Sequence, residues 1–573
     1  MKKPSTNQFV LGVWDGHDAG AALLCDDQVI FAINEERLSR RKLEVGFPHR
    51  SIQACLDYAA ISPSAVHQVA VSTTDPAKTL TRLFPQLKEA YYLLRRRKKK
   101  PGRLDRFKKK FKYRFTELRP NLLSYRLSHS CIKTQLKRTG FINCNLSLLD
   151  HHFCHAQAAA RCSGLKNCVV MTLDGVGDGL SGSIWVFKDS QMKLLKEIPA
   201  RNSLGIFFEH VTNLLNMREL EDEGKVMALA NYAYPIQDPD NPLMRLIETR
   251  GLEIFGKHKA SGLFRVLKDI LWQYPSEQFA FMAQRVLEKN VLTLVRNAVT
   301  LTGMRHVSVA GGVFSNIKLN MKIGELNETD TLFVFPHMGD GGLALGAAVA
   351  VNYIKFGVPG CDLKHLYVGP RFTQETIRSC LKKWGFTYRQ VADSAALAAQ
   401  ILLRGEIVLW FQGRMEMGPR ALGNRSILAR PDKKRIRDRL NTALKKRVWY
   451  QPFCPSILCE DAEALLHVDS QKINANRFMT MAFRVREEYL DLMQGVISVD
   501  GTCRPHFVGP ENSAYRDLLS EVKRKLGKGV ILNTSFNIHG EPMVCSPDDA
   551  LHMFSKTEIK YLFLEDYLVE KAS

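Results

Sequence analysis

Short apolar runs separated by Gly/Asp turns predict paired strands in the first part of the chain. Residues 9–14, 21–25 and 29–33 are apolar stretches of strand length with polar turns between them. A similar order returns at 168–173, where a turn rich in Gly and Asp precedes a further stretch at 183–187. The repetition indicates an internal duplication, with turns whose backbone N–H groups can point at phosphates.

Two strand–turn–helix units complete the predicted first domain. Residues 306–309 and 331–335 are predicted strands, each followed by a glycine turn that opens a helix, at about Ile317 and at 343–353. Glycine turns at helix N-termini suit an anionic ligand, and the candidate binders there are Gly311, Gly312 and Asn316. With the duplicated strands, these units predict an α/β fold with the divided cleft of actin and sugar kinases.

Glycines and prolines concentrate between residues 357 and 370, which is typical of a linker. Beyond it, a helix over 395–404 and strands over 407–411 and 530–532 predict a second α/β domain. We therefore expect a first domain over residues 1–360, a linker and domain entry over 361–388, and a second domain over 389–573.

The composition narrows the class of protein. With 573 residues, 45% hydrophobic and 24% charged, the chain has a globular balance, which excludes disordered, collagen-like and membrane-embedded proteins. No apolar run reaches the roughly 18 residues of a membrane span, and no secretory signal opens the chain, so we expect a cytoplasmic protein. The thirteen cysteines form no Cys-x-x-Cys pair, which disfavours a disulfide framework or a thiolate zinc site.

The net charge of +23 comes mainly from one segment. Residues 82–138 carry twenty Lys and Arg against three acidic residues, centred on 95–100 and 108–110, with aromatic residues between them. Pro101-Gly102 divides the segment into two expected helices. It has the character of an insertion that attracts polyanions, such as anionic lipid headgroups, phosphorylated glycolipid or nucleic acid. The alternative is a solvated, partly disordered insertion.

Histidines and carboxylates provide the candidate metal site. His151 and His155 stand four residues apart in a predicted helix, so they share a face and can bind one cation. Asp340 is the best further ligand, and Asp174 could join directly or through water. This donor set suits Fe(II), Mn or Zn, and surface histidines are the alternative. His17, after the first strand, could act as a general base or make only local hydrogen bonds.

The second domain gathers cationic side chains and neutral donors. Arginine forks and a lysine point charge bind phosphate and carboxylate groups and neutralise charge in phosphoryl or adenylyl transfer. No Gly-x-x-x-x-Gly-Lys-Ser/Thr stretch is present, which disfavours a Walker-type nucleotide site. The candidates are Arg420, Arg425, Ser426, Lys445, Arg447, Arg504, Asn533 and Ser535.

Taken in order, these motifs resemble those of the NodU/CmcH family of bacterial O-carbamoyltransferases over nearly the whole chain. The chain departs from the family at Gln451, where Arg is usual, and at His506, where Gln is frequent. The stretches that carry the resemblance are His17-Asp18, Glu35-Glu36-Arg37, His151-His152-x-x-His155, Asp174-Gly175, Gly224-Lys225, Ala310-Gly311-Gly312, Gly418-Pro419-Arg420-Ala421-Leu422-Gly423, Pro452-Phe453-Cys454-Pro455-Ser456 and Asn533-Thr534-Ser535-Phe536-Asn537.

The resemblance implies two sites. A YrdC-like second domain would make carbamoyl adenylate from carbamoyl phosphate and ATP with Mg(II), with Arg420 and Lys445 as catalytic residues. The first domain would resemble the threonylcarbamoyl-transfer fold of tRNA modification, with Fe(II) as the favoured metal. There a hydroxyl of the acceptor would attack the carbamoyl carbon, with His17 or Asp15 as the base.

The acceptor is expected to be a sugar or natural product. The basic segment favours a phosphorylated or membrane-held glycolipid, such as a lipopolysaccharide core sugar, and a peripheral contact with the inner membrane. Two other functions stay open: a tRNA threonylcarbamoyl-transfer enzyme that binds RNA through the basic arm, and a non-catalytic nucleotide-gated scaffold. A hydrogenase-maturation carbamoyltransferase is disfavoured, because it brings Cys-x-x-Cys motifs.

Overall fold

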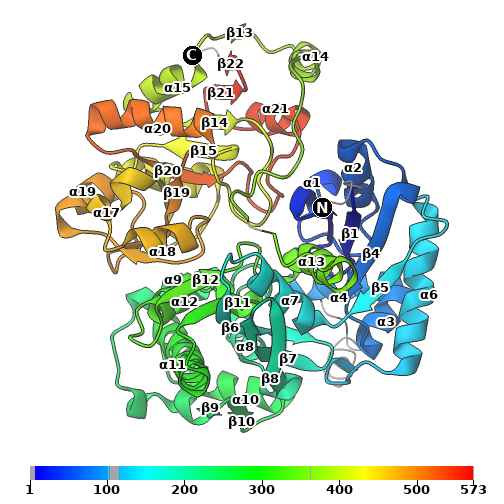
Figure 1. Cartoon of the computed structure of the whole chain (residues 1–573). Helices are drawn as coiled ribbons and strands as arrows, with labels where there is room; N and C mark the ends of the chain where they lie inside the picture. Colours follow the sequence, from blue (N-terminus) through cyan, green and yellow to red (C-terminus); the bar gives the residue numbers. More distant parts are fainter. Residues whose placement is uncertain (1–6, 101, 103–114, 362, 572–573) are drawn as a thin grey trace. The chain divides into compact units, whose positions relative to one another are not determined.

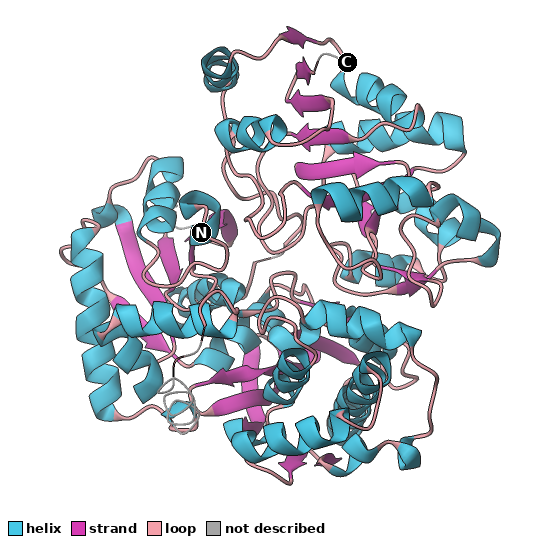
Figure 2. Cartoon of the chain, turned by 180° about the vertical axis from the view of Figure 1, so that it is seen from behind, coloured by secondary structure: helices cyan, strands magenta, loops and turns pink. Residues whose placement is uncertain are grey.

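The computed structural model describes residues 7–100, 102, 115–361 and 363–571 and divides into two compact units (Figure 1). Unit 1 comprises Met1–Glu35 and Leu43–Leu363, and unit 2 comprises Glu36–Lys42 and Lys364–Ser573. In each unit, helices flank the sheets (Figure 2). No helix in the described ranges is long and apolar enough to cross a membrane.

The first sheet of unit 1 contains the strands that the first apolar runs predict. β1 (Phe9–Trp14), β2 (Gly20–Cys25) and β3 (Gln28–Asn34) form an antiparallel meander. β4 (Val66–Ser72) and β5 (Leu146–Leu149) continue the sheet parallel to β1, which gives the order β3-β2-β1-β4-β5. β1 is central and almost fully buried, so its polar turn is held firmly in place.

The second sheet of unit 1 repeats this arrangement. β6 (Asn167–Gly177), β7 (Leu180–Lys188) and β8 (Gln191–Pro199) form the meander, and β11 (His306–Ala310) and β12 (Thr331–Val334) extend it parallel to β6. Its order, β12-β11-β6-β7-β8, is that of the first sheet read from the other end. The predicted duplication and the actin- and sugar-kinase-like fold of this unit are therefore confirmed.

Two helices pack tightly against these sheets. α13 (Leu343–Phe356) lies against β1 and against α7 (His151–Arg161), the helix that carries the predicted histidine pair. Glycines permit the approach, since a Cβ at Gly12 would lie 1.8 Å from the carbonyl oxygen of Ala344 and one at Gly346 would lie 2.3 Å from that of Cys154. The backbone contacts fix α7 relative to both neighbours.

The basic segment is inserted between β4 and β5 and packs on unit 1. It includes α4 (Pro85–Arg95) and α6 (Leu122–Arg138), and α6 packs on the preceding α3 (Pro76–Leu83). Thr79 Oγ1 of α3 lies 2.8 Å from Ser128 Oγ of α6 in this buried contact. The expected break at Pro101 and the lysines of residues 108–110 lie outside the described residues.

Unit 2 is built on one mixed sheet of eight strands. Its centre contains β14 (Val408–Phe411), β15 (Arg425–Ala429), β20 (Val530–Ser535) and β16 (Cys454–Leu458), in that order. Helix α15 (Ser394–Leu403) and helix α20 (Ser513–Leu526) pack together and contribute to one apolar core with the strands. The predicted second α/β domain is present. The segment 361–388, expected as a linker and domain entry, contains α14 (Gln374–Trp384) and leads into β13 (Tyr388–Gln390) of this unit.

Candidate functional site

Four side chains of unit 1 converge into one imidazole–carboxylate cluster. Asp150 caps α7 by accepting a hydrogen bond from the Phe153 N–H, so the helix begins at His151 and places His151 and His155 on one face. Asp174 lies in β6, where the pairing with β7 is irregular, and Asp340 lies in the turn after β12. One ligand atom from each of the four residues lies within 4.8 Å of the others. The structure thus brings together the residues predicted to bind a metal.

The distances within the cluster are uniform. His151 Nε2 lies 3.3 Å from Asp174 Oδ2 and 3.6 Å from Asp340 Oδ1, and His155 Nε2 lies 3.8 and 3.6 Å from the same two atoms. Burial lowers the pKa of His151, but the two carboxylates outweigh it and raise that pKa to about 9. This local negative potential favours a cation.

The surroundings of the cluster orient its ligands. Thr73 Oγ1 lies 3.0 Å from His151 Nδ1, and Asp178 accepts a hydrogen bond from the His151 backbone N–H at 2.7 Å. The Nε2 atom of His155 is buried without a hydrogen-bond partner, as expected of a nitrogen that faces an ion. Two imidazoles and two carboxylates, with no thiolate, therefore fit Fe(II), Mn(II) or Zn(II). The sequence did not predict the roles of Thr73 and Asp178, because they lie 78 and 27 residues from His151 in the chain and no spacing pattern connects them to α7.

The glycine turn after β11 supports Asp174. Gly311 has a φ of 105°, and the Gly312 N–H donates to Asp174 Oδ1 at 3.0 Å, which leaves Oδ2 toward the imidazoles. Asn316, predicted as a ligand binder, instead caps the next helix through the Leu319 N–H and donates to Gln284. Its side chain is used within the fold.

The two candidate bases have different environments. Asp15 is buried between Lys78, at 2.8 Å, and Arg82, whose guanidinium donates to both carboxylate oxygens. Burial raises the pKa of Asp15, but Arg82 and Lys78 together bring it well below its usual value, so Asp15 is a weak base. His17 Nδ1 lies 3.4 Å from Asp340 and 3.3 Å from the Tyr92 hydroxyl, and burial lowers the pKa of His17. The neutral imidazole is thus the better proton acceptor.

Helix α4 contributes three residues that the sequence analysis overlooked. Lys88 donates to the backbone carbonyl of Asp15, and Tyr92 faces His17. Arg95 pairs with both Glu209 and Glu219. The spacing of 88, 92 and 95 places them on one helical face, a signal that was hidden because the basic run suggested a solvated surface.

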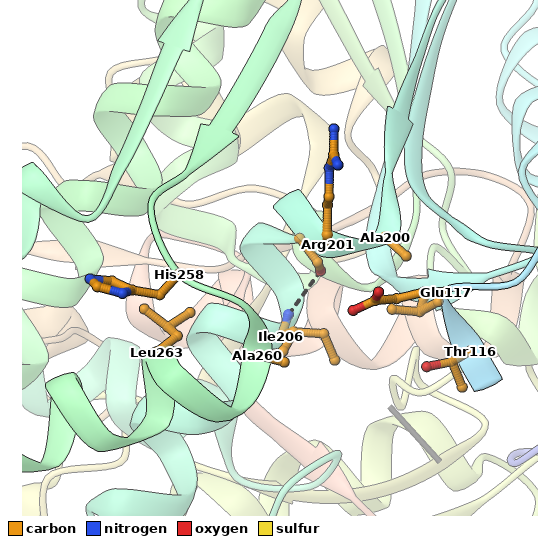
Figure 3. A pocket seen from close by; sticks show the side chains of 10 residues that line it. Thr116, Glu117, Ala200, Arg201, Ile206, His258, Ala260 and Leu263 are labelled. Carbon is orange, nitrogen blue, oxygen red and sulfur yellow. Dashed lines mark hydrogen bonds between the residues drawn. The ribbon is translucent and has the colours of Figure 1, made fainter. Parts of the chain in front are cut away.

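A small pocket is lined in part by Val176, which lies on β6 two residues after Asp174. Its lining also includes Ser203, Arg201, His258 and Glu117 (Figure 3). Ser203 Oγ donates to the carbonyl oxygens of Asp174 and Gly175 and accepts from the Ile206 N–H. These hydrogen bonds join this wall of the pocket to the backbone of Asp174 and Gly175.

Unit 2 places three arginines in one cluster. Burial, Arg504 and Arg447 lower the pKa of Arg420 to about 9, and burial likewise lowers the pKa of Arg447 to about 10. The Arg504 guanidinium donates to Cys454 Sγ at 3.0 and 3.1 Å. None of the three is paired with a carboxylate in the described part of the chain, so the cluster lacks an anion.

The ammonium group of Lys445, a residue that precedes β16 in the chain, lies against the C-terminal end of β20. Its ammonium donates to the Asn537 backbone oxygen at 2.8 Å and to Asn537 Oδ1 at 2.7 Å, and it also contacts the Ser535 carbonyl. Burial, reinforced by Arg447, lowers the pKa of Lys445 well below its usual value. Asn533, on the same strand, donates to Ser456 Oγ at 3.0 Å, while its Oδ1 is buried without a partner. Lys445 and Asn533 thus place a buried ammonium and a buried amide at β20.

Arg425 and Ser426 do not fit their predicted roles as ligand binders. Arg425 is fully buried, stacks 3.5 Å from the Phe411 ring, and donates to the carbonyl oxygens of Gln412 and Asn424. Ser426 accepts a hydrogen bond from Gly423. Both residues lie in β15 with their side chains buried, and their hydrogen bonds fix the loop between β14 and β15.

The two departures from the family pattern also lie inside unit 2. Gln451 Oε1 is buried without a partner. His506 stacks on Tyr515 and lies 3.3 Å from Ser456 Oγ, and burial lowers the pKa of His506 to about 3. His506 therefore adds no charge to the arginine cluster at neutral pH.

Comparison with known proteins gives matches over nearly the whole chain. The family described as carbamoyltransferase N-terminus matches residues 10–349, and that described as carbamoyltransferase C-terminus matches residues 399–571. Nodulation protein NolNO of Sinorhizobium fredii is 32% identical over 97% of this chain and 79% of its own. The 3'-hydroxymethylcephem-O-carbamoyltransferase of Streptomyces clavuligerus is 30% identical over 68% of this chain and 74% of its own.

Proposed function

The chain belongs to the carbamoyltransferase family and is an O-carbamoylating enzyme; on that premise we propose that unit 2 makes carbamoyl adenylate and that unit 1 transfers the carbamoyl group to an alcohol. The observation that carries this proposal is the guanidinium cluster of Arg420, Arg447 and Arg504, which has no carboxylate partner among the residues that the structure describes. A substrate with several phosphate charges supplies the missing anion.

The first reaction balances with one water. Hydrolysis of carbamoyl phosphate gives phosphate and carbamate, a carbamate oxygen attacks the α-phosphorus of ATP, and pyrophosphate leaves. Arg420 and Arg504 would hold the phosphate groups, and Lys445, together with Mg(II) brought by ATP, would offset the charge that develops on the leaving group. The Lys445 ammonium is held in place by hydrogen bonds to Ser535 and Asn537.

The second reaction would use the cluster of unit 1. His151, His155, Asp340 and Asp174 would hold the divalent metal, Fe(II) being favoured by the family resemblance. When bound, the metal supplies Lewis acidity toward an oxygen of the carbamoyl adenylate. His17 accepts the proton of the acceptor hydroxyl, whose oxygen bonds to the carbamoyl carbon as AMP leaves. Asp15 and Tyr92 serve to position this region.

The acceptor we favour is a sugar hydroxyl of a phosphorylated or membrane-held glycolipid, such as a lipopolysaccharide core sugar. The pocket lined by Val176 and Ser203 also contains Arg201 and His258, side chains that suit hydroxyl and phosphate groups. The S. clavuligerus relative is named for transfer to a hydroxymethyl group, which supports a hydroxyl as the attacking group here.

The test supplies ATP and carbamoyl phosphate and follows pyrophosphate, then adds candidate glycans and seeks the mass gain of one carbamoyl group. We expect both signals from the intact protein. His155→Ala should retain pyrophosphate release and lose the mass gain. If threonine and bicarbonate drive pyrophosphate release in place of carbamoyl phosphate, the tRNA threonylcarbamoyl alternative is correct and the proposal fails.

A further inference from the structure

Exposed apolar side chains concentrate on the basic segment and the helix before it. The described residues include twenty large hydrophobic side chains that are exposed, and nine of them lie between residues 80 and 127. Leu122 and Leu123 are 66% and 68% exposed, and Phe84 and Leu87 are 55% and 51% exposed. Single exposed apolar residues are ordinary, but such a concentration marks an interaction surface.

These side chains lie on helices whose other faces are occupied. Thr79 and Ser128 join α3 to α6 in a buried contact, and α4 directs Lys88, Tyr92 and Arg95 toward the catalytic region. Helix α6 runs beside α3 at the margin of unit 1 (Figure 1). The apolar residues of the remaining faces are therefore available to a partner.

The charges of the segment divide into two groups. Arg95 and Arg96 point inward to Glu209, Glu219 and Glu221, so the centre of the arginine run helps to hold the helix in place. Exposed cations remain on the same part of the chain. They are Lys99, Lys100, Arg126 and Lys133. Cationic and aliphatic side chains are thus both exposed on this part of the chain.

We propose that the exposed surface formed by α3, α4 and α6 docks on an anionic lipid bilayer. Leucine and phenylalanine side chains enter the boundary between headgroups and acyl chains, and the exposed cations pair with lipid phosphates. A nucleic acid fits less well, because leucines offer neither hydrogen bonds nor base stacking. Docking would bring a membrane-held acceptor to the enzyme whose site α4 partly builds.

The test is flotation of the full chain with vesicles of phosphatidylcholine, with or without phosphatidylglycerol. We expect binding that requires phosphatidylglycerol and is reduced, but not abolished, at about 0.5 M salt, since screening removes only the ionic part. Phe84→Ser, Leu87→Ser, Leu122→Ser and Leu123→Ser combined should lower the bound fraction about tenfold. A matched control removes four exposed apolar residues elsewhere in unit 1: Tyr234→Ser, Trp272→Ser, Leu301→Ser and Ile354→Ser.

Unchanged binding by the first variant, an equal loss in the control, or no flotation of the unmodified chain would each overturn the docking proposal. Binding of tRNA without vesicle binding would overturn it in favour of RNA. Pyrophosphate release by the variant shows that unit 2 is intact. The proposed adenylate chemistry is scored by that release alone, so the two proposals fail separately.

Discussion

Gly177 determines where the His151 imidazole lies, because a Cβ at position 177 would stand 2.2 Å from the ring. A Gly177→Ala substitution should push the ring away from Asp174 and weaken Mn(II) or Fe(II) binding about tenfold or more. Isothermal titration of the metal measures this. Gly262→Ala, where the new Cβ would meet only ordinary contact at 3.7 Å, is the control. Equal affinity of the two variants would contradict the metal assignment.

A substitution at Arg504 can test whether its positive charge contributes to the adenylate site. Arg504→Gln keeps a polar side chain but removes one of three clustered cations, so pyrophosphate release should slow about 100-fold. The matched change Arg516→Gln breaks only an exposed pair with Glu460 and should leave the rate unaltered. A rate equal to that of the unmodified enzyme in both variants would remove Arg504 from the adenylate site.

At the level of elements, α4 depends on ion pairs that are poorly exposed. Arg95 is 10% exposed, and its partners Glu209 and Glu219 are 11% and 0% exposed. Arg95→Ala leaves two buried carboxylates without their cation, so unit 1 should lose about 3 kcal/mol of unfolding free energy. Denaturant unfolding tests this, with Arg250→Ala in the exposed pair with Glu248 as a control that should not change stability. Unchanged stability in Arg95→Ala would mean that α4 is not anchored there.

Elements with clear apolar periodicity could be predicted. The strands of residues 9–33 and the helix that carries His151 lie within a residue or two of their expected positions. The sequence pattern over 361–388, predicted as a linker and domain entry, did not reveal helix α14. This helix buries only Ile377 and Leu381 and turns its polar face toward solvent. A short amphipathic helix bounded by glycines and prolines has a local pattern close to that of a linker.

For the whole molecule, the two reactions should depend differently on metal. Treating the enzyme with a chelator and then restoring Mg(II) should abolish carbamoyl transfer but leave pyrophosphate release from ATP and carbamoyl phosphate, because the imidazole–carboxylate cluster found among the described residues belongs to unit 1. Fe(II) or Mn(II) should restore transfer. Equal loss of both activities, not recovered by Mg(II), would mean that the metal acts in a shared step or in folding.

The sequence by itself determined the repeated strand order, the pairing of His151 with His155, the excess of cations in residues 82–138 and the arginine-containing motifs of the second domain. These features follow from the order and spacing of residues, because the period of a helix or a strand fixes the side to which each side chain points. The family resemblance added the order of the motifs and hence the class of reaction.

Only the tertiary structure decided which polar groups remain available. Arg425 and Asn316 lie in motifs that suggested ligand binding. In the structure, Arg425 donates to a backbone carbonyl and Asn316 caps a helix. Arg82 and Lys78 of α3 form ion pairs with Asp15, which follows β1, and make its carboxylate a weaker base. Hydrogen bonding and charge compensation act through space between residues far apart in the chain, so no local pattern could have revealed these partners.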